Sequence, residues 1–173
     1  MTTRLFLDTC LLVDYFSARA PFFDAMVKLR VAGILGDAQL WCSAKSFTDV
    51  FYIASKAVAS GDLQRAFLKS LDFLRVASVD EDCVREACLR SWDDFEDCLV
   101  AVAAERCRAD VLLTRDVTGF KRSAVPVMTP EAYLESLRQG QGVWYEWQTS
   151  PALCHPNISE NDSHTMQNDS RHC

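Results

Sequence analysis

Five short apolar runs, each separated from the next by a stretch with helical spacing, constrain the fold of this chain more than any other feature. The runs occupy residues 5–7, 40–42, 75–79, 109–114 and 125–128. Strands that alternate with helices favour a parallel sheet, because each crossover helix must pack on one of its faces. The pattern therefore predicts an α/β three-layer sandwich with a central parallel sheet of about five strands.

Start and stop signals divide the intervening stretches into helices. Pro21 suits the first position of a helix. Ser43 or Ser46 caps the helix after the second strand, and Gly61 breaks the chain before Asp62 caps the next helix. The predicted helices cover residues 21–35, 47–60, 62–73, 84–88, 94–107 and 130–137.

The length and composition suit a single domain with a short appendage. The chain has 173 residues, of which 49% are hydrophobic, and this is enough to build a core. From Gly140 onward the periodicity is lost and polar residues dominate. We predict a folded domain over residues 1–138 and a tail over residues 139–173 that is disordered from about Thr149. The aromatic stretch 144–147 is the part of the tail that could pack back on the domain.

Charge and hydropathy narrow the class of protein. The net charge of −6 argues against tight, nonspecific binding of nucleic acid through a basic face, although local contacts with RNA remain compatible with it. No stretch has the roughly 20 apolar residues that span a bilayer, and the N-terminus lacks the pattern of a signal peptide. The eight cysteines form no C-x-x-C pair, so we expect reduced thiols. These features predict a cytoplasmic protein with no membrane partner.

Acidic residues stand where the predicted strands end and where one helix begins. Asp8 ends the first strand, Asp116 follows the fourth, and Asp97 lies near the start of the helix that Asp94 opens. In a parallel α/β sheet these positions meet at one edge, where ligands bind. Converging carboxylates repel one another, and Mg²⁺ or Mn²⁺ would relieve that repulsion. Each acid also has a structural explanation as a helix or turn cap.

Three segments carry a resemblance to a known family. They read FLDTCLLVDYF, SAKSFTDVFYIASK and DDFEDCLVAVAAERCRADVLLTRDVTGFKRSAVPVMTPEAYL. Together, from about Arg4 to Leu137, they resemble the PIN domain, whose fold is 3′–5′ nuclease-like. The resemblance implies a Mg²⁺- or Mn²⁺-dependent endoribonuclease, and small bacterial members are commonly VapC-type toxins of type II toxin–antitoxin systems. It implies an RNA substrate, a cognate antitoxin and a homodimer.

The resemblance also assigns roles to individual residues. Asp49 stands where the family usually has glutamate. Because aspartate is one methylene shorter, we expect it to reach the metal only through a water. The implied catalytic residues are Asp8, Asp49, Asp97 and Asp116. The implied metal ligands are Asp8, Asp97 and Asp116, with Asp94 sharing the metal or its waters. Thr114 is implied to support the site by hydrogen bonding, and we expect RNA contacts from Arg115, Lys121 and Arg122, which lie close to Asp116 in sequence.

Two other classes of function require motifs that can be checked in the sequence. A phosphoryl-transfer domain with Asp8 as the modified group would need a D-x-D motif, whereas the chain has Asp8-Thr9-Cys10. A receiver-like domain would need paired acids before the phosphorylated Asp and a lysine after a late strand, and neither is present. A non-catalytic interaction or RNA-binding module, whose acids only cap helices, remains the alternative.

Overall fold

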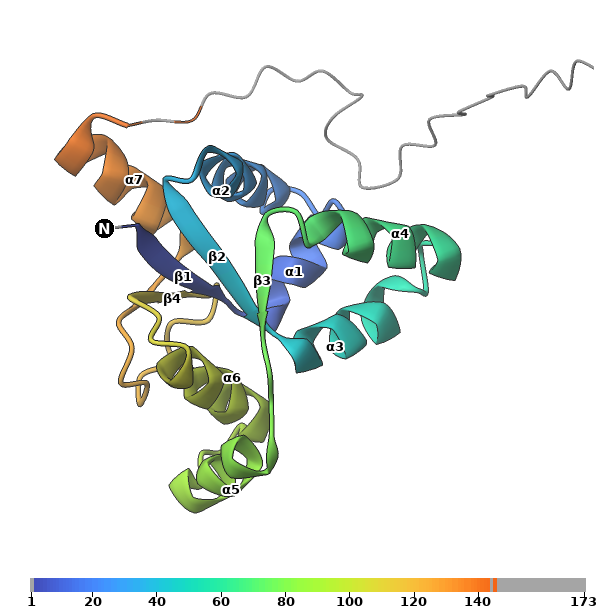
Figure 1. The fold of residues 1–173 in the computed structure, drawn as a ribbon, viewed down its shortest axis with the longest axis vertical. Helices are drawn as coiled ribbons and strands as arrows, with labels where there is room; N and C mark the ends of the chain where they lie inside the picture. The colour runs from blue at the N-terminus through green and yellow to red at the C-terminus, as the bar shows by residue number, and fades with distance from the viewer. Residues whose placement is uncertain (1, 144, 146–173) are drawn as a thin grey trace, which may run out of the picture.

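A sheet of five parallel strands forms the centre of the computed structural model, which describes residues 2–143 and 145 (Figure 1). The strands are β1 (Thr3–Leu7), β2 (Ala38–Ser43), β3 (Leu74–Ala77), β4 (Val111–Leu113) and β5 (Val127–Met128). Their order across the sheet is β3-β2-β1-β4-β5, and every neighbouring pair is parallel. The predicted fold class is confirmed, and each predicted strand is present within a few residues.

Helices cover both faces of the sheet and complete a three-layer sandwich (Figure 1). On one face lie α1 (Thr9–Phe16), α2 (Phe23–Leu35), α3 (Ala44–Ala54), α4 (Ser60–Ser70) and α7 (Pro130–Gln141). On the other face lie α6 (Phe95–Arg106) and, packed against it, α5 (Glu81–Arg90). In the described part of the chain, no helix has both the length and the apolar character needed to cross a bilayer.

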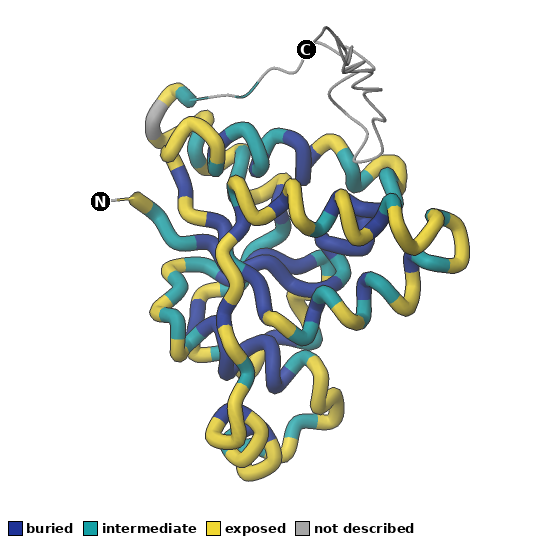
Figure 2. The backbone as a smooth tube through the Cα atoms, turned by 45° about the vertical axis from the view of Figure 1, so that its right-hand side comes forward, coloured by how far each residue is buried: buried dark blue, intermediate teal, exposed yellow. Residues whose placement is uncertain are grey.

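Alternate residues of each strand supply two separate cores. Leu5 and Leu7 of β1 pack with the helices of the first face, whereas Phe6 between them packs with α6 on the second. This alternation follows from the period of two residues along a strand. Figure 2 shows the buried segments concentrated in the middle of the molecule, around the sheet.

Helix α1 is an element that the sequence patterns do not predict. It starts directly after Asp8, and seven of its eight residues are buried. A helix that is apolar on all sides gives no amphipathic stripe, so its sequence reads as a plain apolar run. Its buried residues include Asp14, which is fully inaccessible.

Several predicted helix boundaries are wrong. Helix α4 begins at Ser60, so Gly61 and Asp62 lie in its first turn rather than breaking and capping the chain. An acid in a first turn interacts favourably with the helix dipole, which explains why Asp62 fits there. Helix α3 already ends at Ala54, and α2 begins at Phe23, two residues after Pro21.

The C-terminal helix extends further than predicted. Helix α7 runs to Gln141, so the predicted domain boundary at residue 138 falls inside it. Tyr145 then packs against the larger core, and its hydroxyl donates a hydrogen bond of 2.9 Å to Asp37. Trp144 and residues 146–173, including the tail predicted to be disordered, lie outside the described residues.

Candidate active site

The candidate site lies outside the carboxyl ends of β1 and β4. Strands β1 and β4 are neighbours although they are far apart in sequence, and the backbone N–H of Asp8 donates to Leu113 at 3.0 Å. Asp8 therefore leaves β1 beside the end of β4. In open α/β sheets, ligands bind at such a switch point, outside the carboxyl ends of the strands.

Two side-chain donors fix the carboxylate of Asp8. The residue is buried, with only 6% of its surface exposed. The hydroxyl of Thr114 donates to its Oδ2 at 2.8 Å, and the thiol of Cys10 donates to the same oxygen at 3.0 Å. The same Thr114 hydroxyl accepts a hydrogen bond of 3.0 Å from the backbone N–H of Asp116. Thr114 thus joins two of the acids, as a supporting residue would.

Asp97 and Asp116 converge on a glycine. Their Oδ2 atoms each lie 2.8 Å from the position that a Cβ would take at Gly119. The backbone N–H of Gly119 also donates to Oδ1 of Asp116 at 3.0 Å. The missing side chain of Gly119 therefore leaves the space that the two carboxylates occupy. Nothing in the sequence marks Gly119 as a site residue, because its proximity to Asp97 arises only in the folded chain.

The electrostatic environment of Asp97 shows that the acids crowd one another. Its pKa is raised to about 6, first by burial and then by the negative charges of Asp94, Asp8, Asp116 and Glu96. Like charges disfavour the ionised carboxylate, and a bound cation would reverse that effect.

Asp94 has a structural role that its position in sequence also predicted. Its Oδ1 accepts hydrogen bonds from the backbone N–H groups of Glu96, at 2.8 Å, and Asp97, at 3.1 Å. It is thus the N-cap of α6, which fixes the helix start beside the site. Its contribution to a metal site stays a prediction.

Asp49 is paired with Lys45, which is not among the predicted site residues. The Nζ atom of Lys45 lies 2.5 Å from Oδ2 of Asp49 and 3.0 Å from Oε1 of Glu96. Lys45 precedes Asp49 by one helical turn, and that spacing alone was a signal for the pair. The catalytic role of Asp49 stays a prediction.

The three residues expected to contact RNA have different surroundings. The Nε atom of Arg115 lies 2.8 Å from Oδ2 of the buried Asp14, and its guanidinium lies 4.4 Å from the centre of the Phe22 ring. Arg122 donates to the carbonyl groups of Arg90 and Ser91, at the end of α5. Lys121 is exposed to solvent.

Burial of Asp14 makes the Arg115 pair structurally important. Burial raises the pKa of Asp14, while the positive charges of Arg115 and Arg19 oppose that rise. The geometry gives an ion pair rather than a well-aligned hydrogen bond, because neither Oδ of Asp14 meets a donor at a good angle among the described residues. The predicted role of Arg115 in RNA binding stays a prediction.

The donor set at the sheet edge suits a hard divalent cation. Asp8, Asp97 and Asp116 offer only carboxylate oxygens, which Mg²⁺ and Mn²⁺ prefer. The cradle at Gly119 and the raised pKa of Asp97 both show negative charge that such a cation would neutralise. Within residues 2–143 and 145, however, no three acidic, histidine or cysteine side chains are grouped closely enough to hold a metal ion as they stand in this structure.

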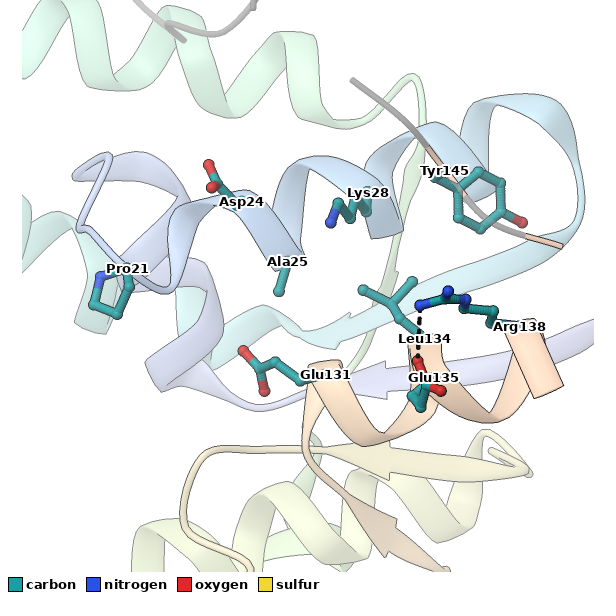
Figure 3. A pocket seen from close by; sticks show the side chains of 9 residues that line it. All are labelled: Pro21, Asp24, Ala25, Lys28, Glu131, Leu134, Glu135, Arg138 and Tyr145. Atoms are coloured by element: carbon teal, nitrogen blue, oxygen red, sulfur yellow. Dashed lines mark ion pairs between the residues drawn. The ribbon is translucent and has the colours of Figure 1, made fainter. Parts of the chain in front are cut away.

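A separate groove lies between α2 and α7. Its volume is about 600 Å³, and Figure 3 shows Lys28, Leu134 and Tyr145 among the side chains that line it. Its lining mixes both signs of charge and includes none of the acids at the sheet edge. We therefore place the candidate active site at the switch point and not in this groove.

The fold and site define an α/β domain with acidic side chains gathered at the topological switch point of a parallel sheet. The family model of the PIN domain matches residues 4–118. The chain belongs to the PIN-domain family, whose members are generally nucleases. No curated protein matches the sequence.

Solved structures share this fold at low sequence identity. A chain of a toxin–antitoxin complex from Klebsiella pneumoniae is 20% identical, with a TM-score of 0.53 over 73% of this chain and 97% of that one. A chain of VapBC2 from Rickettsia felis, bound to a promoter DNA fragment, is 16% identical, with a TM-score of 0.55 over 73% and 98%. A chain of FitAcB from Neisseria gonorrhoeae is 17% identical, with a TM-score of 0.51 over 73% and 98%.

Proposed function

We propose that this protein is a Mg²⁺- or Mn²⁺-dependent endoribonuclease that cleaves RNA phosphodiester bonds. The observation that carries the proposal is the crowding of carboxylates around Asp97, whose pKa is raised to about 6 by burial and by its acidic neighbours. A protein gains nothing in stability from gathering like charges, so their convergence at a switch point supports a cation-binding role. The choice of RNA as substrate rests on the family.

The chain supplies the means to hold and orient such a cation. Asp8, Asp97 and Asp116 would be its protein ligands. When bound, the cation supplies a water of lowered pKa and stabilises charge that develops on the phosphate. Thr114 orients Asp8, and the N–H of Gly119 orients Asp116, so both carboxylates are held before substrate arrives. Lys121, exposed and close to Asp116 in sequence, would contact backbone phosphates of the RNA.

We further infer that the protein is the toxin of a type II toxin–antitoxin pair and acts in the cytoplasm. The structures it resembles come from toxin–antitoxin complexes, which supports an antitoxin as partner. The homodimer belongs to the same proposal. Light scattering of the purified protein tests the homodimer, and a monomer at all concentrations would count against it.

Cleavage of single-stranded RNA tests the proposed activity. The full-length protein should cut RNA with Mg²⁺ or Mn²⁺ and stop when EDTA removes the cation. Asp8→Asn should abolish cleavage while the fold is retained, because it keeps the shape of the side chain and removes its charge. Asp24→Asn is the matched control, since Asp24 is an exposed acid in the first turn of α2. Full cleavage by Asp8→Asn would refute the proposal.

The alternative is a non-catalytic PIN-like module whose acids are structural. The bonds of Asp94 to the start of α6 and of Asp49 to Lys45 favour it for those two acids. The two functions differ in their response to cations. A cation-binding site should raise the melting temperature as Mn²⁺ is added, and Asp8→Asn should remove that rise.

A further inference from the structure

Lys45 occupies a defined position between two acids at the catalytic edge of the sheet. Its backbone N–H is bonded to the side chain of Ser43, which caps α3 directly after β2. Its ammonium group reaches Asp49 on α3 and Glu96 on α6, at 2.5 and 3.0 Å. Lys45 therefore joins two helices whose N-termini border the site.

The Lys45–Asp49 pair is shielded more than an ordinary surface pair, whereas the side chain of Glu96 is 47% exposed. The side chains of Lys45 and Asp49 are only 29% and 27% exposed. Burial alone would lower the pKa of Lys45, but its hydrogen bonds to Asp49 and Glu96 raise the pKa above the usual value. Breaking a charge-assisted hydrogen bond that is partly shielded from water costs more free energy than breaking an exposed one.

The arrangement bears on which acids can hold the divalent cation. Asp49 stands where the family resemblance expects an acid of the site, yet its carboxylate is already bonded to an ammonium. We propose that Lys45 is a built-in cation that keeps Asp49 and Glu96 out of the metal's coordination sphere. Asp8, Asp97 and Asp116 then hold a single divalent cation.

The role given to Lys45 is that of a positioning residue, because it acts through the acids that it holds. This inference rests on the proposed metal site, so its test must separate the failure of the two.

The test is the Mn²⁺ affinity of the full-length protein. Mn²⁺ is titrated into the protein, and the EPR signal of the Mn²⁺ that stays free is recorded. Asp49→Asn should leave the Mn²⁺ affinity within about twofold of wild type, because Asp49 is not a ligand. Lys45→Met should strengthen binding by on the order of three- to tenfold, since it releases two carboxylates near the site. Lys45→Met combined with Asp49→Asn should lose most of that gain, and Lys45→Arg should bind as wild type does.

Two controls make each outcome decisive. Lys56→Met removes a positive charge just beyond α3, where Lys56 stacks on Tyr52, and should leave Mn²⁺ affinity unchanged. Asp8→Asn should abolish tight binding; if it does not, the metal site itself is wrong. If Asp8→Asn weakens binding and Asp49→Asn weakens it as much, Asp49 is a ligand and the role of Lys45 is refuted. Unchanged or weaker binding by a folded Lys45→Met also refutes it, and Asp49→Asn alone decides if that variant does not fold.

Discussion

Gly119→Ala tests whether the space between the carboxylates matters. An added Cβ would lie 2.8 Å from Oδ2 of both Asp97 and Asp116, whereas ordinary contact begins at 3.4 Å. Each oxygen would therefore have to retreat by about 0.6 Å, which exceeds the roughly 0.2 Å tolerance of metal–ligand distances. Because misplacement of about 1 Å can cost about 100-fold in rate, we expect a 10- to 100-fold loss of RNA cleavage.

The loss should occur without unfolding, because the atoms that must move are the ends of two side chains. Gly140→Ala is the matched control, since a Cβ there meets nothing within 4 Å. That residue lies in α7, where alanine is favoured over glycine by about 1 kcal/mol. Cleavage rates and Mn²⁺ affinity are measured for both variants beside their melting temperatures. Wild-type cleavage and Mn²⁺ affinity in a folded Gly119→Ala would refute the reasoning.

Three further predictions concern stability. Asp97→Asn should stabilise the metal-free protein by about 1–2 kcal/mol near pH 7, after allowance for solvent screening, because the pKa of Asp97 is raised to about 6. That gain should shrink as the pH falls through about 6 and be absent by about pH 3, below the ordinary pKa of 3.8, where the carboxyl is protonated in both the folded and the unfolded state. Urea titrations that show an equal gain at pH 7 and at about pH 3 would contradict it. Arg115→Ala should cost about 2–4 kcal/mol in the same titrations, because it removes the nearest cation from buried Asp14. Unchanged stability with lost cleavage would instead assign Arg115 to the substrate. Truncation after Gln148 should leave the melting temperature unchanged. Truncation after Leu137 should lower the melting temperature, because it removes the last turn of α7 and the hydrogen bond from Tyr145 to Asp37. Equal melting temperatures of the two truncated proteins would show that residues 138–148 are dispensable for stability.

Local patterns predict the sheet because its strands are short, apolar and bounded by turn residues. Each strand contributes residues to both faces, so the runs stand out in sequence. Helix α1 escapes the same reasoning, since Leu11, Leu12 and Val13 are all buried and leave no polar face. The partner of Asp14 could not be predicted either, because Arg115 lies about a hundred positions away in sequence and meets it only through the pairing of β1 with β4.

The candidate site likewise combines features that local sequence patterns predict with features that depend on the fold. The positions of Asp8 and Asp116 follow from strand ends, and the capping position of Asp94 follows from the start of a helix. The spacing of four residues on one helix is enough to predict the ion pair of Lys45 with Asp49. The sequence does not predict that Asp97 approaches Gly119, because that contact depends on how the N-terminus of α6 meets the loop after β4.

The central claim is that three carboxylates at the switch point hold one divalent cation. Crystals of the full-length protein grown with Mn²⁺, measured for anomalous scattering of manganese, test it most directly. We expect one manganese peak bonded to carboxylate oxygens of Asp8, Asp97 and Asp116, with Asp49 still bonded to Lys45. A peak bonded to Asp49, or manganese sites only on other faces of the protein, would contradict it.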